Sequence, residues 1–161
     1  MKIEYSPIGI VHSPFQQQAG TPVQPSRANN VQGHIELLPQ YVEGLADLQG
    51  FSHIVLLCHL HQCSGFQMKV TPYLDDNQRG LFATRSPRRP NPIGLSVVEL
   101  LSIENNLLHI QNLDLLDGTP VLDIKPYVGE FDHRQGARFG WFEHAKTITT
   151  ADNRFCNNKS S

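Results

Sequence analysis

Alternating apolar and polar side chains run through much of the chain and predict short β-strands. In residues 31–37, apolar Val31, Ile35 and Leu37 alternate with polar neighbours, the period of a strand with one buried face. Residues 51–60 form the most apolar run, and their short length and β-branched residues favour a fully buried strand. Further strands are expected over residues 3–12, 81–84, 93–103, 107–115 and 121–127.

Turn-forming pairs separate the later strands. Asn105 and Asn106 tolerate positive φ and predict a two-residue hairpin turn. Asp117 and Gly118 predict the next turn, because Asp-Gly is a common turn pair whose carboxylate often bonds local backbone. The same turn also presents a carboxylate and backbone groups to any ligand beside it, so a binding role stays open for Asp117.

The remaining segments are one short helix and long polar loops. After Pro39, apolar residues recur on one helical face and predict a helix over residues 41–48, which Gly50 ends. Residues 15–30 and 62–80 are polar and irregular, as in loops that carry function. At least six short strands with one helix predict a mainly β fold, a barrel or sandwich. The strand–helix alternation and glycine-rich turn of a doubly wound sheet are missing.

A basic loop stiffened by proline follows the second polar segment. Half of the eight arginines fall between residues 79 and 89, and three prolines stand at positions 87, 90 and 92. Proline fixes the backbone, so ordering guanidinium groups on a ligand costs less entropy. The loop therefore predicts an anion-binding site, with Arg85, Arg88 and Arg89 as its candidate ligands; a solvated basic loop is the alternative.

Composition limits the kind of partner. The chain has 161 residues, the length of one domain, with 39% hydrophobic residues and a net charge of −2. A protein that binds nucleic acid through its overall charge is normally basic. If this chain binds nucleic acid, the positive potential must therefore come from a local cluster of basic residues. No apolar run approaches a membrane span and no signal-peptide core is present, which predicts a cytoplasmic protein with no membrane contact.

Other polar clusters support weaker hypotheses. His59 and His61 alternate near the end of the apolar run, as in a cupin-like metal site, but no zinc-finger spacing accompanies them. Lys125 and Tyr127 alternate with apolar residues, so they face a polar side or a site. Aromatic residues interleave with basic ones in residues 131–142 and predict an arm that packs on the core or a second subunit, or stacks on bases.

Four separated blocks resemble a known family. RSPRRPNPIGLS (residues 85–96) and DLLDGTPVLDIKPY (114–127), with IGIVHSPF (8–15) and FSHIVLL (51–57) upstream, resemble the TsaA-like, or TrmO, family of S-adenosylmethionine-dependent tRNA methyltransferases. The resemblance implies a single closed β-barrel that is not a Rossmann-type scaffold. It also implies methylation of N6 of N6-threonylcarbamoyladenosine, the modified purine beside the anticodon. A non-catalytic S-adenosylmethionine- or RNA-binding barrel is the alternative.

The resemblance also implies site residues. The cofactor would be held by four pieces of chain, with Val23 standing where the family often has arginine: Pro22, Val23, Gln24; His61, Gln62; Arg85, Leu95; and Asp117, Gly118, Thr119, Pro120. Asp117 and His61 are the candidate general bases. The candidate residues for substrate binding are Arg85, Arg88, Arg89, Lys125 and Tyr127. No metal is expected.

The resemblance also bears on organisation. It implies tRNA as partner and a homodimer with the cofactor site near the subunit contact. The barrel domain is expected over residues 1–146, followed by a flexible polar tail over 147–161. Longer bacterial relatives carry an additional C-terminal domain, so its contacts with tRNA are expected to be absent here.

Overall fold

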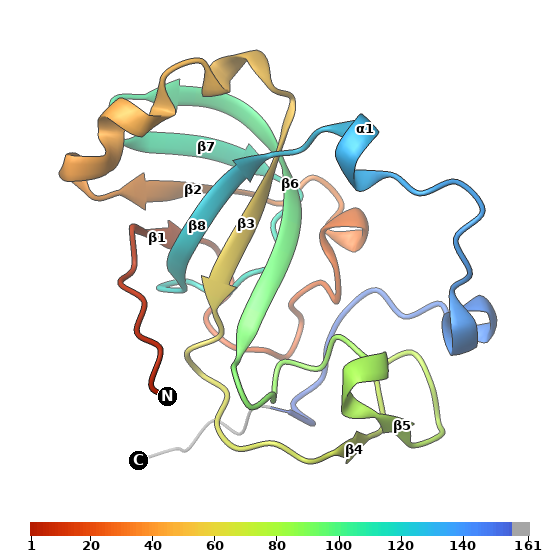
Figure 1. Cartoon of the computed structure of the whole chain (residues 1–161). Helices are drawn as coiled ribbons and strands as arrows, with labels where there is room; N and C mark the ends of the chain where they lie inside the picture. Colours follow the sequence, from red (N-terminus) through yellow and green to blue (C-terminus); the bar gives the residue numbers. More distant parts are fainter. Residues whose placement is uncertain (156–161) are drawn as a thin grey trace.

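The computed structural model describes residues 1–155 and contains a closed antiparallel barrel (Figure 1). Neighbouring strands follow the order β1-β2-β7-β6-β3-β8, and β8 pairs with β1 to close the ring. The strands are β1 (Gly9–His12), β2 (Gln32–Leu37), β3 (His53–His59), β6 (Ile93–Glu104), β7 (Leu107–Gln111) and β8 (Pro120–Pro126). The predicted closed β-barrel is confirmed.

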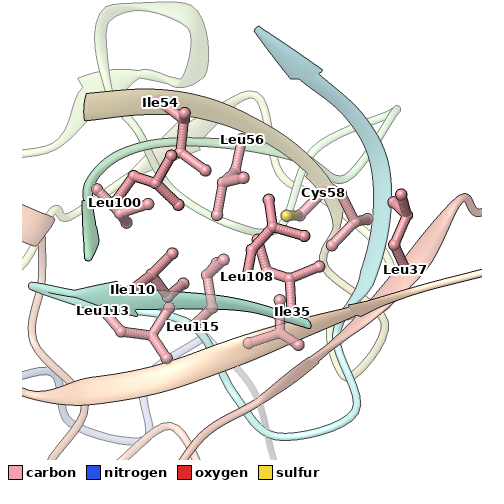
Figure 2. Close-up of a cluster of buried hydrophobic side chains, with 13 residues drawn as sticks. Ile35, Leu37, Ile54, Leu56, Cys58, Leu100, Leu108, Ile110, Leu113 and Leu115 are labelled. Carbon is pink, nitrogen blue, oxygen red and sulfur yellow. The ribbon is translucent and has the colours of Figure 1, made fainter. Parts of the chain in front are cut away.

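Side-chain alternation fills the barrel interior. Val11 of β1 pairs with Ile35 of β2, and Ile35 pairs with Leu108 of β7; all three are completely buried. Figure 2 shows Ile35 and Leu108 converging with Leu56 of β3 and Leu100 of β6, and Val11 belongs to the same cluster. Because a closed ring leaves no strand edge unpaired, the barrel satisfies its backbone groups internally.

The predicted turns are present, and two strands are much shorter than expected: β1 covers Gly9–His12 of the expected residues 3–12, and β7 also ends early. Asn105 adopts φ 55° between β6 and β7, and Gly118 adopts φ 75° before β8. Strand β7 ends at Gln111 because Asn112 takes φ 64°, so the strand expected to reach Leu115 is four residues shorter. The chain after it still lies on the core, since Leu113 is fully buried.

Helical segments differ most from the sequence-based expectation. The strand predicted over residues 81–84 is wrong: Leu81–Ala83 is a 3-10 turn (η4), and the Thr84 hydroxyl and backbone N–H both donate to the Leu81 carbonyl, at 2.7 and 3.1 Å. The predicted helix near residue 41 forms two 3-10 segments, η2 (Pro39–Leu45) and η3 (Leu48–Gly50). The other elements are η1 (Pro25–Arg27), β4 (Lys69–Val70), β5 (Arg79–Gly80), α1 (Gly129–Asp132) and η5 (Gly140–His144).

The C-terminal segment packs against the loops beneath the barrel. The Val23 backbone N–H donates to the Thr149 carbonyl at 3.0 Å, and the Ala151 N–H to the Thr21 carbonyl at 2.7 Å. Phe155 is buried with Val70 and Leu81 in a second, smaller cluster. Residues up to Phe155 of the tail expected to be flexible make these contacts, and the rest of that tail lies outside the described residues. Within residues 1–155, no helix is long and apolar enough to cross a bilayer.

Substitution of Ile35 tests the barrel core. Ile35 is 0% exposed and Ile10, on the neighbouring strand, is 43% exposed. We expect Ile35→Ala to lower the free energy of unfolding by about 2–5 kcal/mol, because it opens a cavity in the core. Ile10→Ala, the matched control, should cost below about 1 kcal/mol. Urea unfolding measures both, and equal losses would contradict this core.

Candidate active site

A cavity of about 900 Å³ lies at one end of the barrel, within the range of small-molecule sites. Its position follows from the strand pairing: His59 pairs with Ile93 and Cys58 with Val121, so the end of β3 and the starts of β6 and β8 meet there. The loops of residues 62–89 and the C-terminal segment close the space below that end of the barrel (Figure 1). Predicted site residues that line the cavity are Pro22, Val23, Gln24, His61, Gln62, Arg85, Arg89, Leu95 and Thr119.

Arg85 connects two of the predicted blocks. Its Nη1 donates a hydrogen bond to Gln24 Oε1 at 2.9 Å. The loop that carries Gln24 is itself anchored, because buried Pro22 forms a β-bridge with Thr150. The guanidinium is exposed to the cavity and has donors beyond the bond to Gln24, which suits an anionic ligand group.

Asp114 is the acidic residue of the cavity lining and was not among the predicted site residues. The Ser96 hydroxyl donates to Asp114 Oδ1 at 2.7 Å. Burial raises the pKa of the Asp114 carboxyl to about 6, and the Ser96 bond and the Arg85 charge limit that rise. A carboxyl that titrates close to neutral pH can accept a proton from a substrate. The signal in the sequence was an aspartate between Leu113 and Leu115, both of which are buried.

His61 stands at the cavity mouth beside the Asp-Gly turn. Burial lowers its pKa, and the charge of nearby His59 lowers it further, so the imidazole is neutral at pH 7. A Cβ added at Gly118 would lie 4.0 Å from His61 Nε2. The turn and the histidine therefore meet, as expected from the resemblance.

Asp117 itself is directed away from the cavity. Its Oδ1 accepts a hydrogen bond from the Ser13 backbone N–H at 3.0 Å, and its own N–H donates to the Phe15 carbonyl at 2.7 Å. The Ser13 bond holds the pKa of Asp117 below its usual value, which weakens it as a proton acceptor. The structural role of a turn residue accounts for these contacts.

Other predicted residues also lie outside the cavity lining: Gly118, Pro120, Arg88, Lys125 and Tyr127. Gly118 donates its N–H to the Val11 carbonyl and Pro120 begins β8, so both serve the turn. Lys125 pairs with Asp123 at 2.6 Å, and Tyr127 contacts the His53 ring edge-on at 6.4 Å. Strand alternation directs Lys125 outward on the barrel, which is why the structure separates it from the cavity.

Arg89 lines the cavity and bonds backbone carbonyls through one terminal nitrogen. Its Nη1 donates to the Thr84 carbonyl at 2.9 Å and, over longer distances, to the Ser86 and Leu81 carbonyls. Its guanidinium also lies 5.8 Å from the centre of the Phe82 ring. Arg89 therefore holds the shape of the basic loop.

Aromatic side chains surround the mouth of the cavity. Phe82, Phe139 and Phe142 line it although they are 69%, 65% and 46% exposed. Trp141 anchors the arm that carries two of them, because its Nε1 donates to the Ala83 carbonyl at 2.8 Å. The interleaved aromatics pointed to this arm, but its place at the cavity depends on a contact 58 residues away in sequence.

Residues 1–155 provide no set of ligands for the metal site that His59 and His61 suggested. Among residues 1–155, no three His, Cys, Asp or Glu side chains are grouped so that they could hold a metal ion. His59 is exposed at the end of β3, whereas His61 belongs to the cavity.

Comparisons with known proteins agree with this architecture. A family model for the tRNA-methyltransferase O N-terminal domain matches residues 10–133. A probable S-adenosyl-L-methionine-binding protein of Pyrococcus abyssi is 48% identical over 158 residues, covering 96% of this chain and 86% of the relative. The tRNA (adenine(37)-N6)-methyltransferase of Escherichia coli is 39% identical over 135 residues, covering 78% of this chain and 57% of that protein.

Solved structures extend the likeness to the fold. A crystal structure of TrmO from Pseudomonas aeruginosa superposes with a TM-score of 0.75 at 43% identity, covering 87% of this chain and 62% of that one. The chain thus spans somewhat more than half the length of these bacterial relatives. The family model covers most of the barrel and most of the cavity's lining segments. This chain belongs to the tRNA-methyltransferase O N-terminal domain family.

Proposed function

We propose that this protein is an S-adenosylmethionine-dependent tRNA adenine-N6 methyltransferase that acts on N6-threonylcarbamoyladenosine at position 37, the position named for its Escherichia coli relative. One observation carries the proposal: a single cavity contains Asp114, with a pKa of about 6, beside Arg85 and most of the residues expected to hold the cofactor. Such a substrate would place the protein in the cytoplasm.

The cavity fits a nucleoside cofactor of this class. When bound, S-adenosylmethionine supplies a methyl group activated by its sulfonium. Exposed Ile93 and Leu95 offer apolar surface suited to a purine ring, and the amides of Gln24 and Gln62 offer polar contacts for orientation. Val23, at the position where the family often has arginine, contributes backbone and an apolar side chain. Thr119 is buried and bonds the Leu116 carbonyl at 2.7 Å, so it shapes the wall.

Asp114 is the proton acceptor in this proposal. The N6–H of the modified adenosine lies between a purine and a carbonyl group, so the nitrogen attacks well only as its proton leaves. The Asp114 carboxylate would take that proton while N6 gains the methyl group. With a pKa of about 6, Asp114 is mostly ionised at neutral pH and is still a stronger base than an exposed aspartate. His61, neutral at the mouth, is the second candidate.

Arg85 is proposed to recognise the threonyl carboxylate. Arg88 and Arg89 were expected to share this role, but Arg89 donates to backbone carbonyls and Arg88 lies outside the cavity lining. Arg85 keeps an unshared end of its guanidinium fork for a bidentate contact with a carboxylate. The charge of this carboxylate would then let the protein distinguish modified from unmodified adenosine.

The surface around the cavity supports a homodimer. Ile93 and Leu95 are 43% and 48% exposed on β6, Phe139 is 65% exposed on the arm, and all three line the cavity. Exposed apolar side chains grouped in this way commonly mark a protein contact. A second copy of the chain that packs on the outer part of this group would place the cofactor site near the subunit contact.

Asp114→Asn tests the proton acceptor. We expect the methyl-transfer rate to fall roughly 100- to 10,000-fold, the usual contribution of a general base. The wild-type rate should rise with pH through about 6, as Asp114 loses its proton, and this rise should be absent in the variant. Asp117→Asn is the matched control and should retain most of the rate. Calorimetry should find S-adenosylmethionine binding in both variants, and a larger loss in Asp117→Asn would reverse the assignment.

Substrates that lack the threonylcarbamoyl group test the role of Arg85. Wild-type protein should methylate tRNA carrying the modification at least about tenfold faster than unmodified tRNA, the value of one charge-assisted contact. Arg85→Gln should reduce that preference. Mass spectrometry of the anticodon-loop nucleosides measures both. Equal wild-type rates on the two tRNAs would contradict the proposed role of Arg85. Cofactor binding with no methylation of either tRNA would favour a non-catalytic barrel.

Phe139→Ser tests the homodimer. Light scattering after size-exclusion chromatography should give a dimer mass for wild type and a shift toward monomer for the variant, because an apolar contact is lost. Tyr41→Ser, which changes an aromatic residue 40% exposed on η2, should leave the dimer intact. A monomeric wild type would overturn this part of the proposal.

A further inference from the structure

A second, smaller cavity of about 180 Å³ lies next to the proposed active site. It is lined by Gln67, Val70, Thr71, Arg88, Arg154 and Phe155. Two guanidinium groups, an amide and a hydroxyl provide hydrogen-bond donors, and no carboxylate belongs to this lining. This composition suits a small anion.

Arg88 supplies the uncompensated positive charge. Its Nε donates to the Ser64 carbonyl at 3.0 Å, which fixes the position of the guanidinium. Within residues 1–155, neither terminal nitrogen of Arg88 has a hydrogen-bond partner or a carboxylate within ion-pair distance. The end of the fork therefore keeps its donors for a ligand, and the bidentate geometry of arginine matches a phosphate.

Arg154 is held in place by the segment around it. Its Nη2 and Nε bond the Asp152 carboxylate at 2.7 and 3.0 Å, and its Nη1 donates to the Pro72 carbonyl at 3.1 Å. Its guanidinium also lies 5.2 Å from the centre of the Tyr73 ring. These contacts remove most of the entropy that a free arginine would lose on binding an anion. Asp152 balances the charge of Arg154, so the net charge at the cavity comes from Arg88.

The two cavities are adjacent. Phe155 lines both, and the neighbouring arginines of the basic loop divide between them, with Arg88 in the small cavity and Arg89 in the large one. An anion in the small cavity would therefore lie close to a nucleoside in the large one. A nucleic acid presents this arrangement, because each nucleoside is followed by a backbone phosphate.

We propose that the small cavity is a subsite for a backbone phosphate of the RNA strand that carries the target adenosine. The assignment rests on the proposed function for the class of ligand, and on the donors of Arg88 that are unpaired within residues 1–155, with Arg154 fixed beside it, for the site. Arg154 lies beyond residues 10–133, which the family model matches, so one of the two arginines of this subsite lies outside the family domain. The subsite also supplies local positive potential in a chain whose net charge is −2.

Binding of RNA tests the subsite directly. The probe is a fluorescently labelled anticodon stem-loop RNA, titrated by anisotropy at several potassium chloride concentrations. We expect Arg88→Gln to weaken binding about tenfold, the value of a charge-assisted contact. Arg154→Gln should weaken it less, because Asp152 already pairs with the Arg154 charge. In Arg88→Gln the slope of log affinity against log salt should become shallower by about 0.7, the change for one phosphate contact with a single strand. Arg88→Lys should keep the slope, because it keeps the charge.

Lys2→Gln is the matched control for loss of one charge. Lys2 is exposed and pairs with Glu4 on the N-terminal segment, so its removal should leave the slope unchanged. If the arginine variants behave like this control, or if wild type does not bind the RNA, the subsite is refuted. Should Arg154→Gln unfold, Arg88→Gln still decides the question, because Arg88 makes one hydrogen bond to the described chain, with Ser64.

Inorganic phosphate separates an RNA site from a free-anion site. Phosphate should displace the RNA from wild type more effectively than chloride of equal ionic strength, and this advantage should vanish in Arg88→Gln. Phosphate binding with no change of RNA affinity in the variants would overturn the RNA assignment. The methyl-transfer assay is independent: RNA binding that depends on Arg154 without methylation would remove the proposed function and leave the subsite standing.

Discussion

Closure of the barrel by β8 is the constraint on which the site depends. Strand β8 pairs with β1 on one side and with β3 on the other. Because both pairs are antiparallel, the residues that precede β8 are brought to the end of the barrel where β3 finishes and β6 starts. Asp114, His61 and Leu95 meet there, although they come from three separate parts of the chain. Backbone pairing therefore assembles the cavity.

The environment of Asp114 explains the raised pKa of its carboxyl. Leu113 and Leu115 pack into the core on either side, so the carboxyl between them is drawn out of water. Removal from water raises its pKa, whereas the Ser96 hydroxyl and the Arg85 charge keep the rise moderate. The pKa of Asp117, three residues later, is lowered instead, because its carboxylate accepts a hydrogen bond from the Ser13 backbone N–H. Burial and local hydrogen bonding therefore give two residues of the same type different pKa values.

Long-range contacts also decide what the basic loop does. Arg85, Arg88 and Arg89 were equivalent in the sequence, as guanidinium groups on one proline-rich loop. In the structure Arg85 bonds Gln24, Arg88 bonds the Ser64 carbonyl, and Arg89 holds carbonyls of its own loop. The loop thus contains one arginine that crosses to the Gln24 loop, one in the neighbouring cavity and one that bonds the loop's own backbone. Each role depends on a partner that spacing alone does not reveal.

The sequence by itself determined most of the strands, the two turns and a mainly β fold, because alternation and turn residues act over a few neighbours. The family resemblance implied the closed barrel, and most of the cofactor residues that it implied line the cavity. The tertiary structure decided the rest. It placed Asp114 in the cavity lining and Asp117 outside it, formed a 3-10 turn where a strand was expected at residues 81–84, and set residues 149–151 against the loops below the barrel. These outcomes depend on which groups, distant in sequence, lie next to one another in the folded chain. The loss of water and the hydrogen bonds between such groups arise only when the barrel has closed.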